Sequence, residues 1–321
     1  IHQGWVQIKN LPGIGGTTRV GRQVLSFGSQ RIIGGLDWLN QGRRFDGARQ
    51  TYNWNEKDQL DLFFVQLREI LNQDNDDSIM VGGFGTVHPT EKSLLDAYAL
   101  HLYQANTGVG MVTNRTTLGV RYVNDFTDNL KFEAEVATQT GEQNGADIPF
   151  GETYAGVASL RFAPDAEMKP WVMVEVNVAS GDDPATADNE RFNSLFPTLH
   201  KYWGMMDFAD WANLMHGMAQ VGAKVTDNGS LSASFHIFRA MEEGDDVKGP
   251  TATLSNGAAA GSSKDMGHEL DFLYKHTFPT ERVKTSLQVG YGVFLPGDGV
   301  QDALATDDVA HFLYVMNDFR F

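Results

Sequence analysis

The sequence predicts an all-β fold, a transmembrane antiparallel β-barrel, on the strength of three observations. Apolar and polar residues alternate over about fifteen segments, most with the roughly ten-residue length of a tilted membrane strand. Short turns and long loops alternate between these segments, as periplasmic turns and outer loops do in bacterial barrels. The last segment is amphipathic and ends on the aromatic residue Phe321.

The alternation is clearest in W-V-M-V-E-V-N-V at 171–178, where valine occupies every even position from 172 onward. Glu175 and Asn177 lie on the opposite face, because successive strand residues point to opposite sides. We expect the apolar face to meet lipid and the polar face to line a lumen. The predicted strands lie near 2–9, 17–27, 45–54, 59–71, 78–86, 94–105, 115–126, 130–143, 149–163, 169–182, 215–226, 229–242, 266–278, 283–297 and 308–321.

Composition narrows the class of protein. The 25 basic and 41 acidic side chains give a net charge of −16, which disfavours a nucleic-acid partner because phosphate contacts need a surplus of Lys and Arg. No apolar run approaches the roughly 18 residues that a membrane helix needs. The mean hydropathy of −0.30 still permits membrane strands, since only every second side chain of such a strand meets lipid. The absence of cysteine excludes disulfides, thiol nucleophiles and thiolate metal sites.

The connections separate a membrane barrel from the main alternative, a soluble β-sandwich. In a sandwich the apolar faces of two sheets point at each other, so alternation alone fits both folds. A sandwich, however, has no reason to segregate its loops by length. The short turns lie at 55–58, 124–129, 164–169, 226–230 and 278–282, and the long connections near 28–44, 183–214, 243–265 and 298–307. Helical periodicity is weak throughout, and is strongest near 205–216.

The chain termini add a prediction about strand number. Phe321 shares a face with Phe319, Val315 and Leu313, which resembles the signal that outer-membrane proteins present to the barrel-assembly machinery. If Phe321 is periplasmic, the first segment runs from outside to inside. A barrel that starts in the periplasm needs an even number of strands, so we expect one or more N-terminal strands to be missing and about 16–18 in the complete protein. Ile1 is not an initiator Met and the sequence contains no signal peptide, as expected of an exported protein after processing or truncation. Residues 1–321 are predicted to form a single barrel domain.

The polar strand faces supply the candidate functional residues. They can form a selectivity filter, in which Arg and Lys attract anions and pair with carboxylates. Alternatively, opposite charges on neighbouring strands pair and stiffen the wall. The predicted lumen residues are Arg22, Arg49, Arg68, Arg115, Arg121, Arg161, Lys224, Glu175, Glu269 and Asp271.

Other chemistry finds less support. The acidic clusters at 74–77, 181–184 and 242–246 are rich in the oxygen ligands that Ca²⁺ prefers. They lack the spacing of a Ca²⁺ loop, so solvated surface charge is the better interpretation and no cofactor or metal is predicted. Ser234 and His236 lie two residues apart on one face, about 6.6 Å along a strand, which is too far for a direct hydrogen bond. We therefore predict that the protein is not an enzyme.

Four stretches resemble the alginate export family of bacterial outer-membrane proteins. They are residues 19–49, residues 179–213 with A-S-G-D-D-P and H-K-Y-W-G-M-M-D-F, G-H-E-L-D at 267–271, and G-Y-G-V-F-L-P-G-D at 290–298. The resemblance implies a barrel of about eighteen strands with an Arg-rich lumen that passes an anionic polysaccharide. The positions that match the family by motif are Arg22, Arg31, Arg49, Asp182, His200 and Asp207.

Together these patterns predict a passive outer-membrane channel for anionic solutes or an anionic polysaccharide. The expected partners are outer-membrane lipid and lipopolysaccharide, an anionic sugar polymer or small anionic solute, and the assembly machinery. The alternative is a general or nutrient-uptake porin with weak selectivity. An adhesin or scaffold would instead have a plugged lumen. The sequence leaves open whether the long loop 183–214 folds inward.

Overall fold

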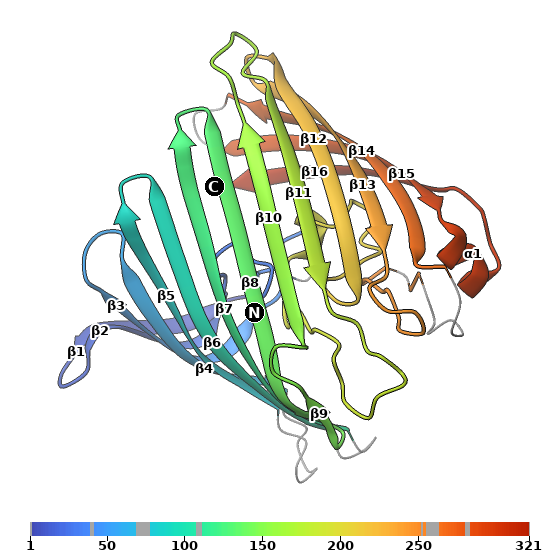
Figure 1. Ribbon diagram of the computed structural model, residues 1–321. Helices are drawn as coiled ribbons and strands as arrows, with labels where there is room; N and C mark the ends of the chain where they lie inside the picture. Colours follow the sequence, from blue (N-terminus) through green and yellow to red (C-terminus); the bar gives the residue numbers. More distant parts are fainter. Residues whose placement is uncertain are drawn as a thin grey trace. The chain divides into compact units, whose positions relative to one another are not determined.

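The computed structural model describes residues 2–38, 42–68, 78–106, 111–251, 253–254, 263–279 and 283–320, with the side chains at 68, 106 and 111 left aside. Within these residues sixteen strands form one antiparallel sheet, and the long strands neighbour one another in chain order (Figure 1). The short β9 pairs with β8 outside this order. In the described part of the chain, no helix is both long enough and apolar enough to cross a membrane.

The strands are β1 (Gly4–Leu11), β2 (Gly15–Gln23), β3 (Phe45–Asn53), β4 (Gln59–Arg68), β5 (Ser78–Thr90), β6 (Ser93–Asn106), β7 (Met111–Thr127), β8 (Leu130–Gln143), β9 (Ala146–Ile148), β10 (Tyr154–Phe162), β11 (Trp171–Ala179), β12 (Leu214–Thr226), β13 (Gly229–Arg239), β14 (Asp265–Phe278), β15 (Lys284–Pro296) and β16 (Ala310–Arg320). Each of the fifteen predicted segments corresponds to one long strand. The additional elements are β9, a 3-10 turn at Leu199–Lys201 and the helix α1 (Asp298–Leu304).

The predicted alternation between faces is confirmed. On β11, Val174 and Val176 are 50% and 62% exposed. The alternate residues Glu175 and Asn177 are 5% and 1% exposed. On β16, Leu313, Val315 and Phe319 are likewise exposed. The exposed face is apolar and the polar face is covered by protein, which is the reverse of a soluble sheet and is typical of a membrane barrel.

The chain divides into two compact units. Unit 1 contains residues 1–124, 134–156 and 182–198, and unit 2 contains residues 125–133, 157–181 and 199–321. In unit 1, residues 24–36 and 182–198 pack on the polar face of the strands, and in unit 2 residues 199–213 do the same. We call this covered face the inner face of each unit, and the exposed apolar face the outer face.

The stretch near 205–216, where the weak helical periodicity is strongest, contains no helix. Residues 205–213 form turns and bends, and β12 begins at Leu214. The backbone N–H groups of Met205 and Met206 bind the carboxylates of Asp271 and Glu269, so they are not used in helical hydrogen bonds. The apolar residues that produced the periodicity, among them Ala209, are buried by this tertiary packing.

The short turn between β3 and β4 is held by a hydrogen-bonded aspartate. Asn55 Nδ2 donates to Asp58 Oδ2 over 2.7 Å, and His88 Nδ1 lies 2.9 Å from Asp58 Oδ1. The backbone N–H of His88 also donates to Asp58 Oδ1 over 2.8 Å. These hydrogen bonds, that from Asn55 first, hold the pKa of Asp58 below its ordinary value.

This lowered pKa predicts an acid-dependent contribution to stability. Because the folded pKa lies below the unfolded value of about 3.9, the stabilisation is fully present above that pH and disappears as the pH falls through the folded pKa. We expect Asp58→Asn to unfold more easily than the wild type at pH 7, and the difference between the two to shrink below about pH 4. Thermal unfolding of both proteins in vesicles over this range measures it. A difference that stays constant with pH contradicts the assignment.

Candidate functional site

The inner face of unit 1 carries arginines that pair with carboxylates on neighbouring strands. Arg49 of β3 donates from Nε and Nη2 to the two carboxylate oxygens of Asp61 on β4, over 2.8 Å each. Asp61 is fully buried and also accepts from Gln59. Arg121 of β7 donates to Asp96 of β6 over 2.7 Å. Both pairs follow the cross-strand pattern that stiffens a sheet.

Arg49 also borders a polar pocket of about 200 Å³ at the short-turn end of β1 to β4. Arg19 lines the same pocket, where it donates to Gln7 Oε1 over 2.8 Å and lies over the ring of Trp5 at 4.2 Å. The lining residues are Gln7, Thr17, Arg19, Arg49, Thr51, Asn53 and Gln59. They include two guanidinium groups and no carboxylate, so the pocket suits a hydroxylated or anionic solute.

Arg19 is a site residue that the sequence reasoning missed, and Arg22 was assigned to the wrong face. On a regular strand residues three apart point to opposite sides. The register pairs Arg19 with Arg49 and Arg22 with Asp46. Arg22 therefore shares the outer face with Val20, where it forms an exposed bidentate pair with Asp46 over 2.7 and 2.8 Å.

Arg115 of β7 is the most deeply buried of the predicted arginines described here, with 1% exposure. Among the described residues its hydrogen-bond acceptors are neutral oxygens. Its Nη atoms donate to Gln139, to Gln143 and to the backbone carbonyl of Arg191. Gln139 Nε2 in turn donates to the carbonyl of Asn193 over 2.6 Å. Arg115 thus fastens residues 191–193 to the inner face and is not exposed to a solute.

Residues 24–36 are anchored to the inner face of unit 1 by aromatic stacking and a carboxylate. Phe27 stacks between Phe63 and Phe84, with ring centroids 5.4 and 4.9 Å away. Ser29 donates to Glu135 Oε2 over 2.7 Å, and the hydroxyl of Tyr98 donates to Oε1 of the same residue. Glu135 therefore holds a connecting segment that precedes it by 106 residues.

On the inner face of unit 2, a row of polar side chains crosses four strands. Asn177 Nδ2 on β11 donates to Glu175 Oε1 over 2.9 Å and faces His216 Nδ1 on β12 at 3.0 Å. His216 Nε2 lies 2.9 Å from His236 Nδ1 on β13, and His236 Nε2 lies 3.4 Å from Asp271 Oδ2 on β14. Since the amide nitrogen of Asn177 can only donate, His216 Nδ1 accepts, and both rings are then neutral with the proton on Nε2.

This row ends on the carboxylates that hold the inner segment of unit 2, residues 199–213. The backbone N–H of Met205 donates to Asp271 Oδ2 over 3.1 Å, and that of Met206 donates to Glu269 Oε1 over 3.0 Å. Within the segment, His200 Nδ1 lies 3.2 Å from Asp207 Oδ2. The structure therefore brings together five predicted residues, Glu175, His200, Asp207, Glu269 and Asp271.

The remaining predicted residues lie elsewhere. Arg161 of β10 lies over the ring of Trp171 at 5.0 Å, and Lys224 is exposed near the short-turn end of β12. Arg31 is buried within residues 24–36, and Asp182 accepts from the backbone N–H of Glu190. The side chain of Arg68, Phe321 and the acidic cluster at 74–77 are outside the described part of the structure.

The anchoring of residues 199–213 makes a testable prediction. Replacing Asp271 by alanine leaves the buried N–H of Met205 without its acceptor, which costs about 1–3 kcal/mol. We expect Ala209→Cys, a fully buried reporter in a chain free of cysteine, to react much faster with a maleimide in the Asp271→Ala background. Asp318→Ala, at a carboxylate on β16 that binds only the neighbouring Arg320 among described contacts, is the control. If the Ala209→Cys reporter reacts at the same rate alone, with Asp271→Ala and with Asp318→Ala, the anchoring role is contradicted.

No group of three or more His, Asp or Glu residues within the described part of the chain is arranged to hold a metal ion. The acidic clusters at 181–184 and 242–246 lie within that part.

A family profile described as alginate export matches residues 1–315. Among solved structures, Pseudomonas aeruginosa OccK11 (OpdR) is similar with a TM-score of 0.60 and 12% identity, covering 95% of this chain and 78% of that one. The outer membrane protein OprD from Pseudomonas aeruginosa has a TM-score of 0.59 and 12% identity, with 94% and 75% covered. These likenesses show the fold of an outer-membrane porin. No curated protein matches the sequence.

Proposed function

Since this chain belongs to the alginate export family and is a channel of the bacterial outer membrane, we propose that it passes anionic solutes, carboxylated sugar polymers among them, by passive diffusion. The proposal assigns the first contact with the solute to the polar pocket bordered by Arg19 and Arg49. Family and fold are those of transport proteins, not of enzymes.

The observation that carries the proposal is the charge and chemistry of this pocket. Two guanidinium groups border it, while the one carboxylate that binds Arg49, Asp61, is fully buried behind it. Guanidinium groups bind carboxylates through two parallel hydrogen bonds. The threonine hydroxyls and the amides of Asn53 and Gln59 match the hydroxyl groups of a sugar. A solute that is both anionic and hydroxylated would meet Arg19 and the neutral groups, while Arg49 and Gln59 keep their hydrogen bonds to Asp61.

A specific observation favours the second candidate, a general porin with weak selectivity. Arg49 and Arg121 are each paired with a buried aspartate, so the field that they present to a passing ion is largely cancelled. A lumen of this kind would discriminate by size and not by charge. The two functions differ in whether Arg19 controls selectivity.

The test is single-channel recording in a planar bilayer under a KCl gradient, with and without oligoalginate. We expect an anion-selective reversal potential and block by the oligomer. Arg19→Gln should weaken the block about tenfold or more, because a hydrogen bond to a charged group contributes about 1.5–3 kcal/mol. Arg22→Gln is the matched control, since Arg22 lies on the same strand but on the opposite face. Cation selectivity or no selectivity, together with no block, refutes the proposal and leaves the general porin.

A further inference from the structure

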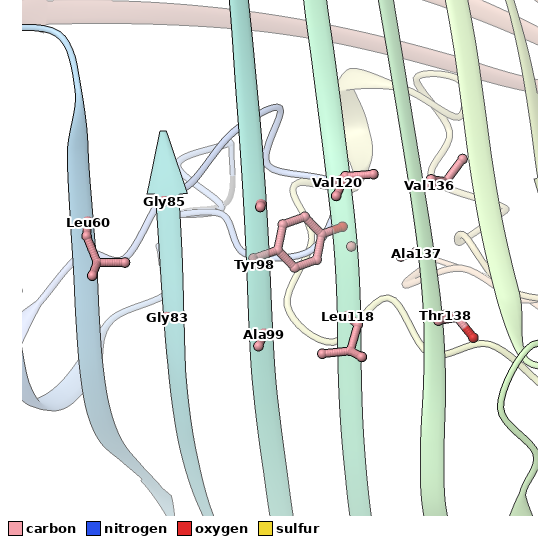
Figure 2. A pocket seen from close by; sticks show the side chains of 12 residues that line it. Leu60, Gly83, Gly85, Tyr98, Ala99, Leu118, Val120, Val136, Ala137 and Thr138 are labelled. Atoms are coloured by element: carbon pink, nitrogen blue, oxygen red, sulfur yellow. The ribbon is translucent and has the colours of Figure 1, made fainter. Parts of the chain in front are cut away.

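The outer face of unit 1 contains an apolar hollow of about 770 Å³ over β5 and β6 (Figure 2). Its lining residues are Leu60, Gly83, Gly85, Ala97, Tyr98, Ala99, Leu118, Gly119, Val120, Val136, Ala137 and Thr138. Tyr98 reaches it only from behind, since its ring packs against Gly119 and its hydroxyl donates to Glu135 on the inner face. Thr138 supplies the one remaining polar side chain in this lining.

The hollow arises from two neighbouring cross-strand rows in which small residues lie between large ones. In the first row Leu60, Gly85, Ala97 and Val120 lie opposite one another on β4, β5, β6 and β7. The second row has the same order: Leu62, Gly83, Ala99 and Leu118. Leucine and valine side chains therefore rise on both sides, while the two central strands present little more than backbone.

Large side chains also close the hollow at the end nearer the short turns. Val87, Leu95 and Tyr122 form the next row there, and each is more than a third exposed. Large side chains therefore surround the hollow on both sides and at this end, and they would keep a flat protein surface from reaching its floor. A single flexible hydrocarbon chain can follow such a depression, because it bends at every methylene. A second copy of this protein presents an outer face of large side chains, which would meet the rim first.

We propose that this hollow binds an acyl chain of a phospholipid. The outer face lies against hydrocarbon in an outer-membrane protein, and an unfilled hollow would forfeit the dispersion contacts of its lining. The hollow lies five to eight residues from the turn at 91–92 that joins β5 and β6, a short turn. Short turns of bacterial barrels face the periplasm, so an acyl chain of the inner leaflet, which extends inward from that side, reaches this depth. Exposed Trp54 at the short turn between β3 and β4 marks the interface at that end of unit 1.

The experiment uses the full chain in vesicles of phosphatidylethanolamine and phosphatidylglycerol that contain a small fraction of phospholipid with a diazirine in the acyl chain. After irradiation, adducts are located by peptide mass spectrometry. We expect adducts at Leu118, Val120 and Val136 several times more often than at Val174 and Val176. These two valines lie on the outer face of β11, outside the lining of this hollow. An even distribution over both sets overturns the proposal.

Gly85→Leu fills the hollow. A Cβ there would meet only Ala97 O at 3.8 Å and Leu60 Cδ1 at 3.9 Å, so the substitution introduces no clash at Cβ. It should lower the adducts in the hollow to the level of the β11 valines. Gly217→Leu is the control, because Gly217 is a β12 glycine with nothing within 4 Å of a Cβ. It should leave the adducts in the hollow unchanged.

Two further results decide between occupants. Ala97→Ile, whose β-branched side chain suits a strand, should reproduce the effect of Gly85→Leu if that variant does not assemble. Because the chain has no cysteine, a single Ala99→Cys reports on protein neighbours. Disulfide-linked dimers through this residue in vesicles would assign the hollow to a second copy and overturn the phospholipid proposal. Adducts unaffected by both filling variants would overturn it as well.

Discussion

Asp61→Ala is expected to lower the free energy of unfolding by about 3–5 kcal/mol, the range for removing one partner of a buried ion pair. Asp61 is fully buried and binds both Nε and Nη2 of Arg49, whose side chain is only 21% exposed. The substitution leaves this guanidinium without its carboxylate in the same place. Denaturant unfolding of the protein in vesicles measures the loss.

The exposed pair Arg22–Asp46, which joins β2 and β3 on the opposite face, provides the control. Arg22 and Asp46 have the same bidentate geometry, but their side chains are 47% and 52% exposed. Asp46→Ala should therefore cost about 0–1 kcal/mol. The double variant Arg49→Leu with Asp61→Ala should recover part of the loss, since it removes the uncompensated charge. Equal costs at Asp61 and Asp46 would show that burial does not set the strength of these pairs.

Trp203→Ala is expected to cost about 3–5 kcal/mol, the range for truncating a buried aromatic side chain. Trp203 is fully buried within the inner segment of unit 2 and packs beside Trp211, with ring centroids 6.3 Å apart. Its loss leaves a cavity between residues 199–213 and the strands. We expect limited proteolysis to cut this segment in the variant and to spare it in the wild type.

Trp54→Ala is the matched control for Trp203→Ala. Trp54 lies at a short turn and is 63% exposed. Its removal takes little apolar surface out of a packed interior, so the unfolding free energy should change little and residues 199–213 should stay resistant. Cleavage of this segment in both variants would mean that it is not fixed by the packing of Trp203.

Much of the fold could be predicted because strand periodicity is a local property. The valines at every even position of β11 and the carboxylate between them already assign its two faces, and exposure in the structure follows that assignment. The same local rule could not separate Arg19 from Arg22, because G-G-T-T-R-V-G-R-Q contains a single large apolar residue, Val20. Their faces are decided by the register of β2 against β3.

The candidate site depended on contacts that no local pattern contains. The sequence supplied the residue types: arginines, carboxylates and histidines on the polar faces of the strands. It also indicated that 199–213 belongs to a long connection. The hydrogen bonds that attach this connection to β14 join groups far apart in the chain. Met206 and Glu269 are 63 residues apart, and Met205 and Asp271 are 66 residues apart. A backbone N–H is present at every residue except proline, so its choice of acceptor leaves no trace in the sequence.

The sequence by itself therefore determined the strands, the two faces of those strands that alternate clearly, and the separation of short turns from long connections, because alternation acts over neighbouring residues. Only the tertiary structure decided which charges neutralise one another. The pairing of Arg49 with Asp61 and the row from Glu175 to Asp271 depend on strand register and on the packing of the inner segments. The sequence does not distinguish an aspartate that faces a solute from one that faces a buried arginine, because the charge of each is set by the groups that surround it in the fold.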